Sequence, residues 1–225
     1  MSNNEIMTEG YVLSEIHKRI MTSLVIIVVV STVLVAGGWL LVIAIMALAA
    51  AMNKEWSNIT PKSSIGWKIA GIAYITLPCI AALALRDLSF AAILFPIALI
   101  IATDIGAYIA GRTIGGPKLI PAISPNKTWA GLGGGITAAI IVSLLLQHYV
   151  PYPNSILSAT LAAIIVAIFA QAGDFFESWL KRKQGVKDSG TLLPGHGGLL
   201  DRLDGYIFVL PIYLLYLVLA AETSV

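Results

Sequence analysis

The polar segment 178–204, close to the carboxyl end of an otherwise apolar chain, is the part of the sequence best equipped for chemistry. Its 27 positions hold five Lys or Arg residues, three Asp residues, five Gly residues and one His. Asp201 and Asp204 are three positions apart, so in a helix that begins there they share one face at about 5–6 Å. Two carboxylates at that spacing can hold one divalent ion or bridge two, and with no Cys or paired His nearby they favour Mg²⁺ over zinc.

A glycine-rich run precedes these aspartates. Pro194-Gly195-His196-Gly197-Gly198 lies just before the predicted helix, where successive backbone N–H groups can converge on an anion beside the positive helix end. Acids for a metal ion, with amides and lysines for phosphate, indicate a phosphoryl- or nucleotidyl-transfer site. Each feature alone has an ordinary explanation, since a glycine run is usually a turn and Asp201 with Arg202 can form an interfacial ion pair. Their density in one segment favours the functional interpretation.

Membrane-spanning helices must position these residues. Apolar residues make up 58% of the 225 positions and charged residues 12%, about half the charged fraction of a soluble domain. This composition excludes a disordered chain, and a net charge of +2 excludes an ordinary nucleic-acid binder. We expect an all-α integral membrane protein with about seven transmembrane helices. The predicted spans are Ile20–Met52, which Gly37-Gly38 divides into a hairpin of two, Ile65–Leu85, Leu88–Gly111, Trp129–Val150, Ser155–Glu177 and Leu203–Ala221.

The basic residues predict how these spans are oriented. With a cytoplasmic N-terminus and a crossing at every span, 13 of the 14 Lys and Arg residues lie inside and only Arg86 lies outside. The C-terminus is then outside. The predicted organisation is a cytoplasmic tail 1–19, N-terminal spans in 20–87, and a catalytic region 88–225 with cytoplasmic loops 112–128 and 178–202. The chemistry is expected on these two loops.

Acidic residues within apolar spans are further candidates. Asp104 and Asp174 lie in predicted spans or at their inner ends, where an unpaired carboxylate is costly, so each should face a polar cavity, a cation or a partner. Asp104, Tyr108 and Arg112 recur every four residues and form one stripe that could line a polar funnel. Alternatively, Asp104 pairs with a neighbouring helix only for packing. The acids of the tails and loops are expected to be solvated: Glu5, Glu9, Glu15, Glu55, Asp87 and Glu222.

The two polar regions resemble the phosphatidate cytidylyltransferases, also called CDP-diacylglycerol synthases. The signature of that family reads here as Ser178, Lys181-Arg182, Lys187-Asp188, Pro194–Gly198 and Asp201–Asp204, with every spacing kept. Three upstream stretches are similar to further family motifs: Gly173–Ser178, Asp104–Arg112 and Ser124–Trp129. The chain departs from the family at Ala130, where Glu is common, and many members are longer.

The resemblance implies that CTP and phosphatidic acid give CDP-diacylglycerol and pyrophosphate, in phospholipid biosynthesis, at the cytoplasmic face of a bacterial inner membrane. A lipid phosphate is already a nucleophile at neutral pH, so no Ser-His-Asp triad is required. The site must instead hold two polyanions in line for attack, which calls for metal ions and cationic donors. CTP, phosphatidic acid and membrane lipids are the expected partners, nucleic acid is not, and a homodimer is left open.

On this hypothesis each polar residue has a predicted role. Mg²⁺, as one ion or two, would be bound by Asp174, Asp188, Asp201 and Asp204. Phosphate charge would be neutralised by Lys127, Lys181, Arg182, Lys187 and Arg202. Further phosphate donors would be Ser124, Ser178, Ser189 and the amides of Gly195, Gly197 and Gly198. His196 would contact phosphate or hold the loop. The phosphatidic acid head group would enter along Asp104, Tyr108 and Arg112. The residues expected nearest the reacting phosphates are Lys187, Asp188, His196, Asp201, Arg202 and Asp204.

Other classes of membrane protein also place acids in or near their spans. A CDP-alcohol phosphotransferase or a lipid kinase is one alternative, although Asp204-Gly205 lacks the downstream aspartates of the first. A secondary transporter would show repeated halves and polar residues spread along its spans, whereas here they gather on one side. A retinal protein is excluded because the last span has no lysine. Incorporation of labelled CTP into lipid, with and without phosphatidic acid, separates these classes.

Overall fold

Seven long helices make up most of the protein, as the hydropathy predicts. The computed structural model describes residues 3–60, 65–150, 155–186, 188–190, 192 and 197–222. All seven helices contain a stretch long and apolar enough to cross a membrane, which confirms the all-α membrane fold. The helices are α1 (Asn3–Ala36), α2 (Gly38–Ile59), α3 (Ile65–Leu88), α4 (Phe90–Thr113), α5 (Trp129–Leu146), α6 (Ile156–Gln184) and α7 (Leu200–Glu222), with a short 3-10 helix at Gln147–Tyr149.

The first two spans meet in the predicted hairpin at Gly37. Gly37 and Gly38 have φ angles of 62° and 51°, in the left-handed region that glycine enters without a Cβ clash. Arg86, near the end of α3, closes this turn: its Nε donates to the carbonyl oxygen of Leu34 at 2.7 Å and its Nη2 to that of Val35 at 3.2 Å. Two carbonyl groups at the end of α1 thereby gain partners that the helix itself cannot supply.

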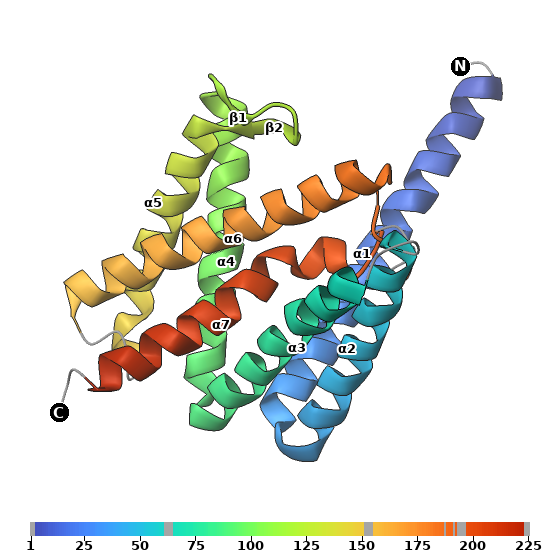
Figure 1. The fold of residues 1–225 in the computed structure, drawn as a ribbon. Coiled ribbons are helices and arrows are strands. Elements are labelled where there is room, and N and C mark those ends of the chain that lie inside the picture. Colours follow the sequence, from blue (N-terminus) through green and yellow to red (C-terminus); the bar gives the residue numbers. More distant parts are fainter. Residues whose placement is uncertain are drawn as a thin grey trace.

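The helices form three neighbouring groups (Figure 1). The helices α1, α2 and α3 lie along one edge, α4 and α5 pair along the other, and α6 and α7 run antiparallel between them. The packing of α7 against α3 joins the groups. Large apolar side chains of α1 are exposed, as expected for a helix that faces lipid.

Small residues allow α4 and α5 to pack closely. A Cβ added at Gly131 would lie 3.0 Å from the carbonyl oxygen of Ala107, and one added at Gly135 would lie 2.9 Å from that of Thr103. Both distances are too short for an ordinary Cβ contact, so these positions accept only glycine without a shift of the backbone. The close pairing fixes the end of α4 beside the start of α5.

The loop between α4 and α5 contains a short antiparallel sheet that the sequence did not predict. Its strands are β1 (Lys118–Ile120) and β2 (Ser124–Thr128). Thr128 ends β2 and also caps α5, because its hydroxyl accepts a hydrogen bond from the N–H of Gly131 at 3.0 Å. The strands are too short and polar to show the alternation that identifies a half-buried strand.

Functional loops gather at one end of the molecule. The β1–β2 hairpin, the start of α3 and the connection from α6 to α7 lie at that end, whereas the Gly37 turn, the turn between α3 and α4, and the end of α7 lie at the other (Figure 1). The helix α6 continues to Gln184, seven residues beyond the predicted end of its span, so 178–184 is helical rather than loop. Gly185, at φ 70°, ends the helix in a left-handed C-cap.

Candidate functional site

Five acidic side chains gather where α4, α6 and α7 meet. We call them the acidic cluster: Asp104 on α4, Asp174 and Glu177 on α6, and Asp201 and Asp204 on α7. Asp204 interacts electrostatically with Asp174 and Asp104, and Glu177 interacts with both Asp204 and Asp201. The two polar segments that the sequence predicts to be functional therefore converge on one cluster.

A close crossing of α6 and α7 brings these acids together. A Cβ added at Gly173 would lie 3.2 Å from the Cα of Gly205 and would overlap the backbone of Asp204. Gly173 is buried and has no side chain, so the two helix backbones touch at this level. Asp174 follows Gly173 directly and Asp204 precedes Gly205 directly, which explains why their carboxylates are neighbours.

Lys127 reaches the acidic cluster from β2. Its ammonium group forms an ion pair with Asp174, donates a hydrogen bond to Oε1 of Gln171 at 3.0 Å and lies 4.6 Å from the centre of the Phe175 ring. The capping of α5 by Thr128 fixes the adjacent backbone and hence the reach of this lysine. The structure thus brings Lys127 to the predicted metal-binding acids.

Lys181 lies at the other side of the cluster. Its Nζ is 2.5 Å from Oδ1 of Asp201 and 3.6 Å from Oε1 of Glu177. Glu177 and Lys181 are one helical turn apart on α6, so the contact with Asp201 is the one that crosses to α7. Each half of the acidic cluster therefore holds one lysine.

The second oxygen of Asp201 organises the connection between α6 and α7. Oδ2 accepts hydrogen bonds from the N–H and the hydroxyl of Ser189, both at 2.9 Å, and from the N–H of Gly198 at 3.0 Å. Gly197, at φ 81°, is the glycine of this turn. The amide of Gly198 was expected to cradle a phosphate, and in this structure it donates to Asp201.

Asp201 and Asp204 have different surroundings although one helical turn separates them. Asp201 contacts Lys181 and Ser189, whereas Asp204 accepts a hydrogen bond from the N–H of Gly205 at 2.7 Å and interacts with the Asp104–Asp174 side of the cluster. Glu177 interacts with both. Asp201 and Asp204, the pair expected from the spacing, therefore belong to two adjoining groups of side chains, and Glu177 interacts with both groups.

The chemistry of the cluster fits a hard cation. Its carboxylates outnumber its two lysines, and Glu177 is only 2% exposed, with no hydrogen-bond partner for either carboxylate oxygen among the described residues. Burying a carboxylate in this way is costly, and a cation would offset the cost. Across the described part of the chain, no three His, Cys, Asp or Glu side chains are arranged so that they could hold a metal ion. Metal binding would therefore require the acids to turn from their lysines toward a shared ion.

The predicted stripe on α4 is present and exposed. Nη1 of Arg112 donates to the hydroxyl of Tyr108 at 2.9 Å, and Asp104, one turn before Tyr108, interacts electrostatically with Asp174 and Lys127. The stripe thus leads from the end of α4 to the acidic cluster. The interaction of Asp104 with Lys127 also fits the alternative in which this acid pairs with a neighbouring element for packing.

The other predicted residues lie on β2, α6 and α7 and in the α6–α7 connection, or outside the described residues. Ser178 on α6 and Ser124 on β2 are half-buried, and three charged residues are exposed: Arg182, Asp188 and Arg202. The residues that fall outside the described part of the chain are Lys187, Gly195 and His196.

Three polar residues at this end were not predicted to take part. Glu177 marked the end of a predicted span and was given no role, although its spacings to Asp174 and Lys181 place all three near one another on α6. Gln171, which is 7% exposed and binds Lys127, lies one turn before Asp174. Glu55 was expected to be solvated, and that expectation is wrong: it lies on α2, is 5% exposed and contacts the start of α7.

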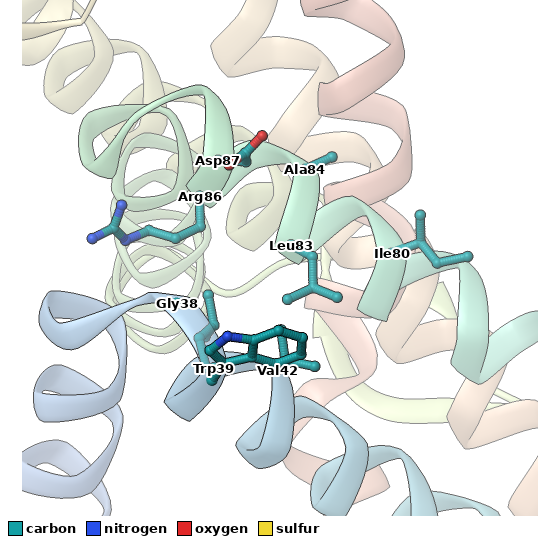
Figure 2. Close-up of a pocket in the computed structure, with 9 residues that line it drawn as sticks. Gly38, Trp39, Val42, Ile80, Leu83, Ala84, Arg86 and Asp87 are labelled. Carbon is teal, nitrogen blue, oxygen red and sulfur yellow. The ribbon is translucent and has the colours of Figure 1, made fainter.

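A cavity of about 580 Å³ lies at the opposite end of the helices, between α2 and α3. Figure 2 shows it lined by Trp39 and Val42 of α2 and by Leu83 and Arg86 of α3, among others. The lining is mostly apolar, and the Arg86 guanidinium is engaged by the end of α1. This cavity is far from the acidic cluster, and none of the predicted site residues is among those that line it.

The fold and the site define an integral membrane protein with an acidic, lysine-bearing site at one end of its spans. The sequence model described as the cytidylyltransferase family matches residues 63–220. This protein belongs to that family. The matched range contains the whole acidic cluster, together with Lys127 and Lys181, and it excludes Glu55.

Relatives in two bacterial groups are similar over much of the chain. A phosphatidate cytidylyltransferase of Brucella suis biovar 1 (strain 1330) is 40% identical over 193 residues, which cover 84% of this chain and 69% of the relative. The phosphatidate cytidylyltransferase of Staphylococcus epidermidis (strain ATCC 12228 / FDA PCI 1200) is 44% identical over 144 residues, which cover 64% of this chain and 55% of the relative.

Proposed function

We propose that this protein transfers the cytidylyl group of CTP to phosphatidic acid and releases CDP-diacylglycerol and pyrophosphate, in phospholipid biosynthesis. Membership of the cytidylyltransferase family and relatives named phosphatidate cytidylyltransferase support this function. The structural observation that carries it is the acidic cluster with a lysine at each side, Lys127 and Lys181. Carboxylates that can bind a cation and lysines that can bind phosphate are what nucleotidyl transfer between two anions requires.

The reaction joins two substrates that repel one another. An oxygen of the lipid phosphate attacks the α-phosphorus of CTP; the new P–O bond forms as the bond from that phosphorus to the bridging oxygen breaks, and pyrophosphate leaves with the electron pair. Positioning and charge neutralisation are therefore the main tasks of the protein. Lys127 and Lys181 supply cationic groups from two sides of the site, and Arg112 supplies one at the mouth of the stripe on α4.

We further propose Mg²⁺ as the cofactor, as one ion or two. Asp174, Asp201 and Asp204 would hold it, with Asp188 of the α6–α7 connection as an additional ligand. Bound Mg²⁺ would neutralise phosphate charge and polarise the phosphoryl oxygens. The all-oxygen donor set is the reason to prefer Mg²⁺ to a transition metal.

The site is proposed to face the cytoplasm of a bacterial plasma membrane. CTP is water-soluble, and all the basic residues except Arg86 fall on that side in a seven-span chain with a cytoplasmic N-terminus. The exposed stripe Asp104–Tyr108–Arg112 lies along α4, which spans the membrane. It offers phosphatidic acid a sideways entry in which the head group reaches the acidic cluster while the acyl chains stay in lipid.

Membranes that contain the overproduced protein provide the test. Label from CTP carried on the cytosine ring should enter the lipid phase only when phosphatidic acid and Mg²⁺ are both supplied, and the product should migrate as CDP-diacylglycerol. Membranes with the Asp204→Asn variant at equal protein level serve as the control for other enzymes. Labelling that is independent of phosphatidic acid, or equal in the variant, would contradict the proposed function.

A further inference from the structure

The helix α2 supplies a carboxylate to the start of α7. Oε1 of Glu55 accepts a hydrogen bond from the N–H of Leu199 and Oε2 accepts one from the N–H of Leu200, both at 2.9 Å. Leu200 is the first residue of α7, and the first N–H groups of a helix have no partner within it. Glu55 therefore caps α7 from a different transmembrane helix, where negative charge also meets the positive end of the helix dipole.

The same carboxylate also contacts the α6–α7 connection closer to α6, at Ser189 and Gly190. The hydroxyl of Ser189 lies 3.2 Å from Oε2 of Glu55 and 2.9 Å from Oδ2 of Asp201, so its single hydrogen lies between the two carboxylates and is shared by them. Gly190 passes so close that an added Cβ would lie 2.6 Å from Oε1 of Glu55. Residues 189–190 and 199–200 are thus held to one side chain.

We propose that Glu55 is a positioning residue for the active site: it clamps the α6–α7 connection at 189–190 and at 199–200 and thereby fixes Asp201 against Lys181. This inference rests on the proposed function of the acidic cluster. Glu55 acts on the cluster through Ser189 and the first turn of α7. The helix α2, which precedes the residues matched by the family model, thus takes part in building the site.

The chemistry of the clamp requires a carboxylate of this length. Each oxygen of Glu55 accepts a backbone N–H, from Leu199 and from Leu200, and the hydroxyl that Ser189 shares with Asp201 lies beside the second oxygen. A carboxylate accepts on both oxygens, and hydrogen bonds to a charged acceptor are stronger than neutral ones. The amide of a glutamine would accept on one oxygen only and would turn an NH₂ donor toward another donor. An aspartate is one methylene shorter and would reach fewer of these groups.

The experiment compares Glu55→Gln with Lys54→Gln, a neighbouring change of one charge on an exposed side chain. Amide hydrogen exchange of purified protein in detergent is measured over residues 197–204, and steady-state kinetics are measured with CTP and phosphatidic acid. We expect Glu55→Gln to speed exchange in this segment by about 10-fold and to lower kcat by about 10-fold with little change in KM for phosphatidic acid. Lys54→Gln should match the parent protein in both.

A double-mutant cycle with Ser189→Ala separates positioning from general stabilisation. If Glu55 acts through Ser189, the double variant should lose little more kcat than the more affected single variant. The clamp is contradicted if Glu55→Gln leaves exchange at 197–204 unchanged. It is equally contradicted if the variant lowers only the amount of folded protein while kcat of the remainder stays at the parent value.

These outcomes are distinct from failure of the proposed function. Parent protein that forms no CDP-diacylglycerol would contradict that function, whereas the exchange comparison would still decide whether Glu55 holds the connection. Normal parent activity with identical exchange in both variants would contradict the clamp alone.

Discussion

Lys181 of α6 and Asp201 of α7 form an ion pair, with 2.5 Å between Nζ and Oδ1. The other oxygen of Asp201 holds Ser189 and Gly198, so this one carboxylate joins a cation of the site to the connection that follows α6. The ion pair therefore links Lys181, a proposed phosphate-binding residue, to the geometry of the α6–α7 connection. A metal ion that drew Asp201 toward itself would disturb both the ion pair with Lys181 and the hydrogen bonds from Ser189 and Gly198.

Neutralising either aspartate of α7 should abolish activity. Asp201→Asn loses the ion pair with Lys181, and Asp204→Asn removes charge from the Asp104–Asp174 side of the cluster. We expect each variant to lower CDP-diacylglycerol formation by about 100-fold or more at unchanged protein level, measured by immunoblot. Full activity in both variants would be incompatible with the assignment of these acids to Mg²⁺.

Glu177→Gln should separate activity from stability. Both carboxylate oxygens of Glu177 are buried without a hydrogen-bond partner in the described part of the chain, and Lys181 is 3.6 Å away. A neutral amide of the same shape costs less to bury. We expect the thermal unfolding temperature in detergent to stay the same or rise, while kcat falls by about 10-fold or more. A variant that is both fully active and unaltered in its response to Mg²⁺ would show that this carboxylate has no part in cation binding.

The crossing of α6 and α7 should tolerate no side chain at Gly173. An added Cβ would overlap the backbone of Asp204 and force the helices apart, so Gly173→Ala should lower both the unfolding temperature and activity. Gly133→Ala is the matched control, because Gly133 lies in the helix α5 and a Cβ added there would meet open space. It should stabilise the protein by up to about 1 kcal/mol through helix propensity. Equal behaviour of the two variants would contradict the close crossing.

Lys127→Gln should weaken substrate binding. The change removes the ion pair with Asp174 and the proposed phosphate contact, and we expect KM for CTP or phosphatidic acid to rise by about 10-fold. Lys118→Gln, on the exposed strand β1 of the same hairpin, should leave both KM values within about 2-fold, as is usual for a surface change. Unchanged KM values in Lys127→Gln would remove this lysine from the binding site.

Single cysteines can test the orientation of the site. In a Cys79→Ser background, which removes the one natural cysteine, a cysteine introduced at Lys118 should react with an impermeant thiol reagent only after the cells are opened. A cysteine introduced at Asp87, an exposed residue near the other end of the helices, should react in intact cells. The reverse pattern would place the acidic cluster outside the cytoplasm.

Hydropathy and charge predict the seven spans, the hairpin at Gly37 and the gathering of functional loops at one end, because each depends on local composition. Three candidates from one segment, Lys181, Ser189 and Asp201, lie together in the structure, and their roles stay predictions. The end of α6 was placed too early, because Lys181, Arg182 and Lys183 interrupt the apolar run although all three are good helix formers.

Contacts between distant segments could not be predicted in this way. Glu55 was taken for a solvated residue because it follows the apolar part of α2, and its partners at 199–200 are 144 and 145 positions away. The pairing of Lys127 with Asp174 likewise depends on how the β1–β2 hairpin rests on α6. Such long-range relations are set by helix packing, which hydropathy does not describe.

The most direct measurement compares CTP labelled at the α-phosphate with CTP labelled at the γ-phosphate, using purified protein, phosphatidic acid and Mg²⁺. Transfer of a cytidylyl group predicts that the α label enters lipid, that the γ label leaves as pyrophosphate, and that Asp204→Asn abolishes both. Entry of the γ label into lipid would show a kinase, and absence of both labels from lipid and pyrophosphate would show that the acidic cluster does not perform this transfer.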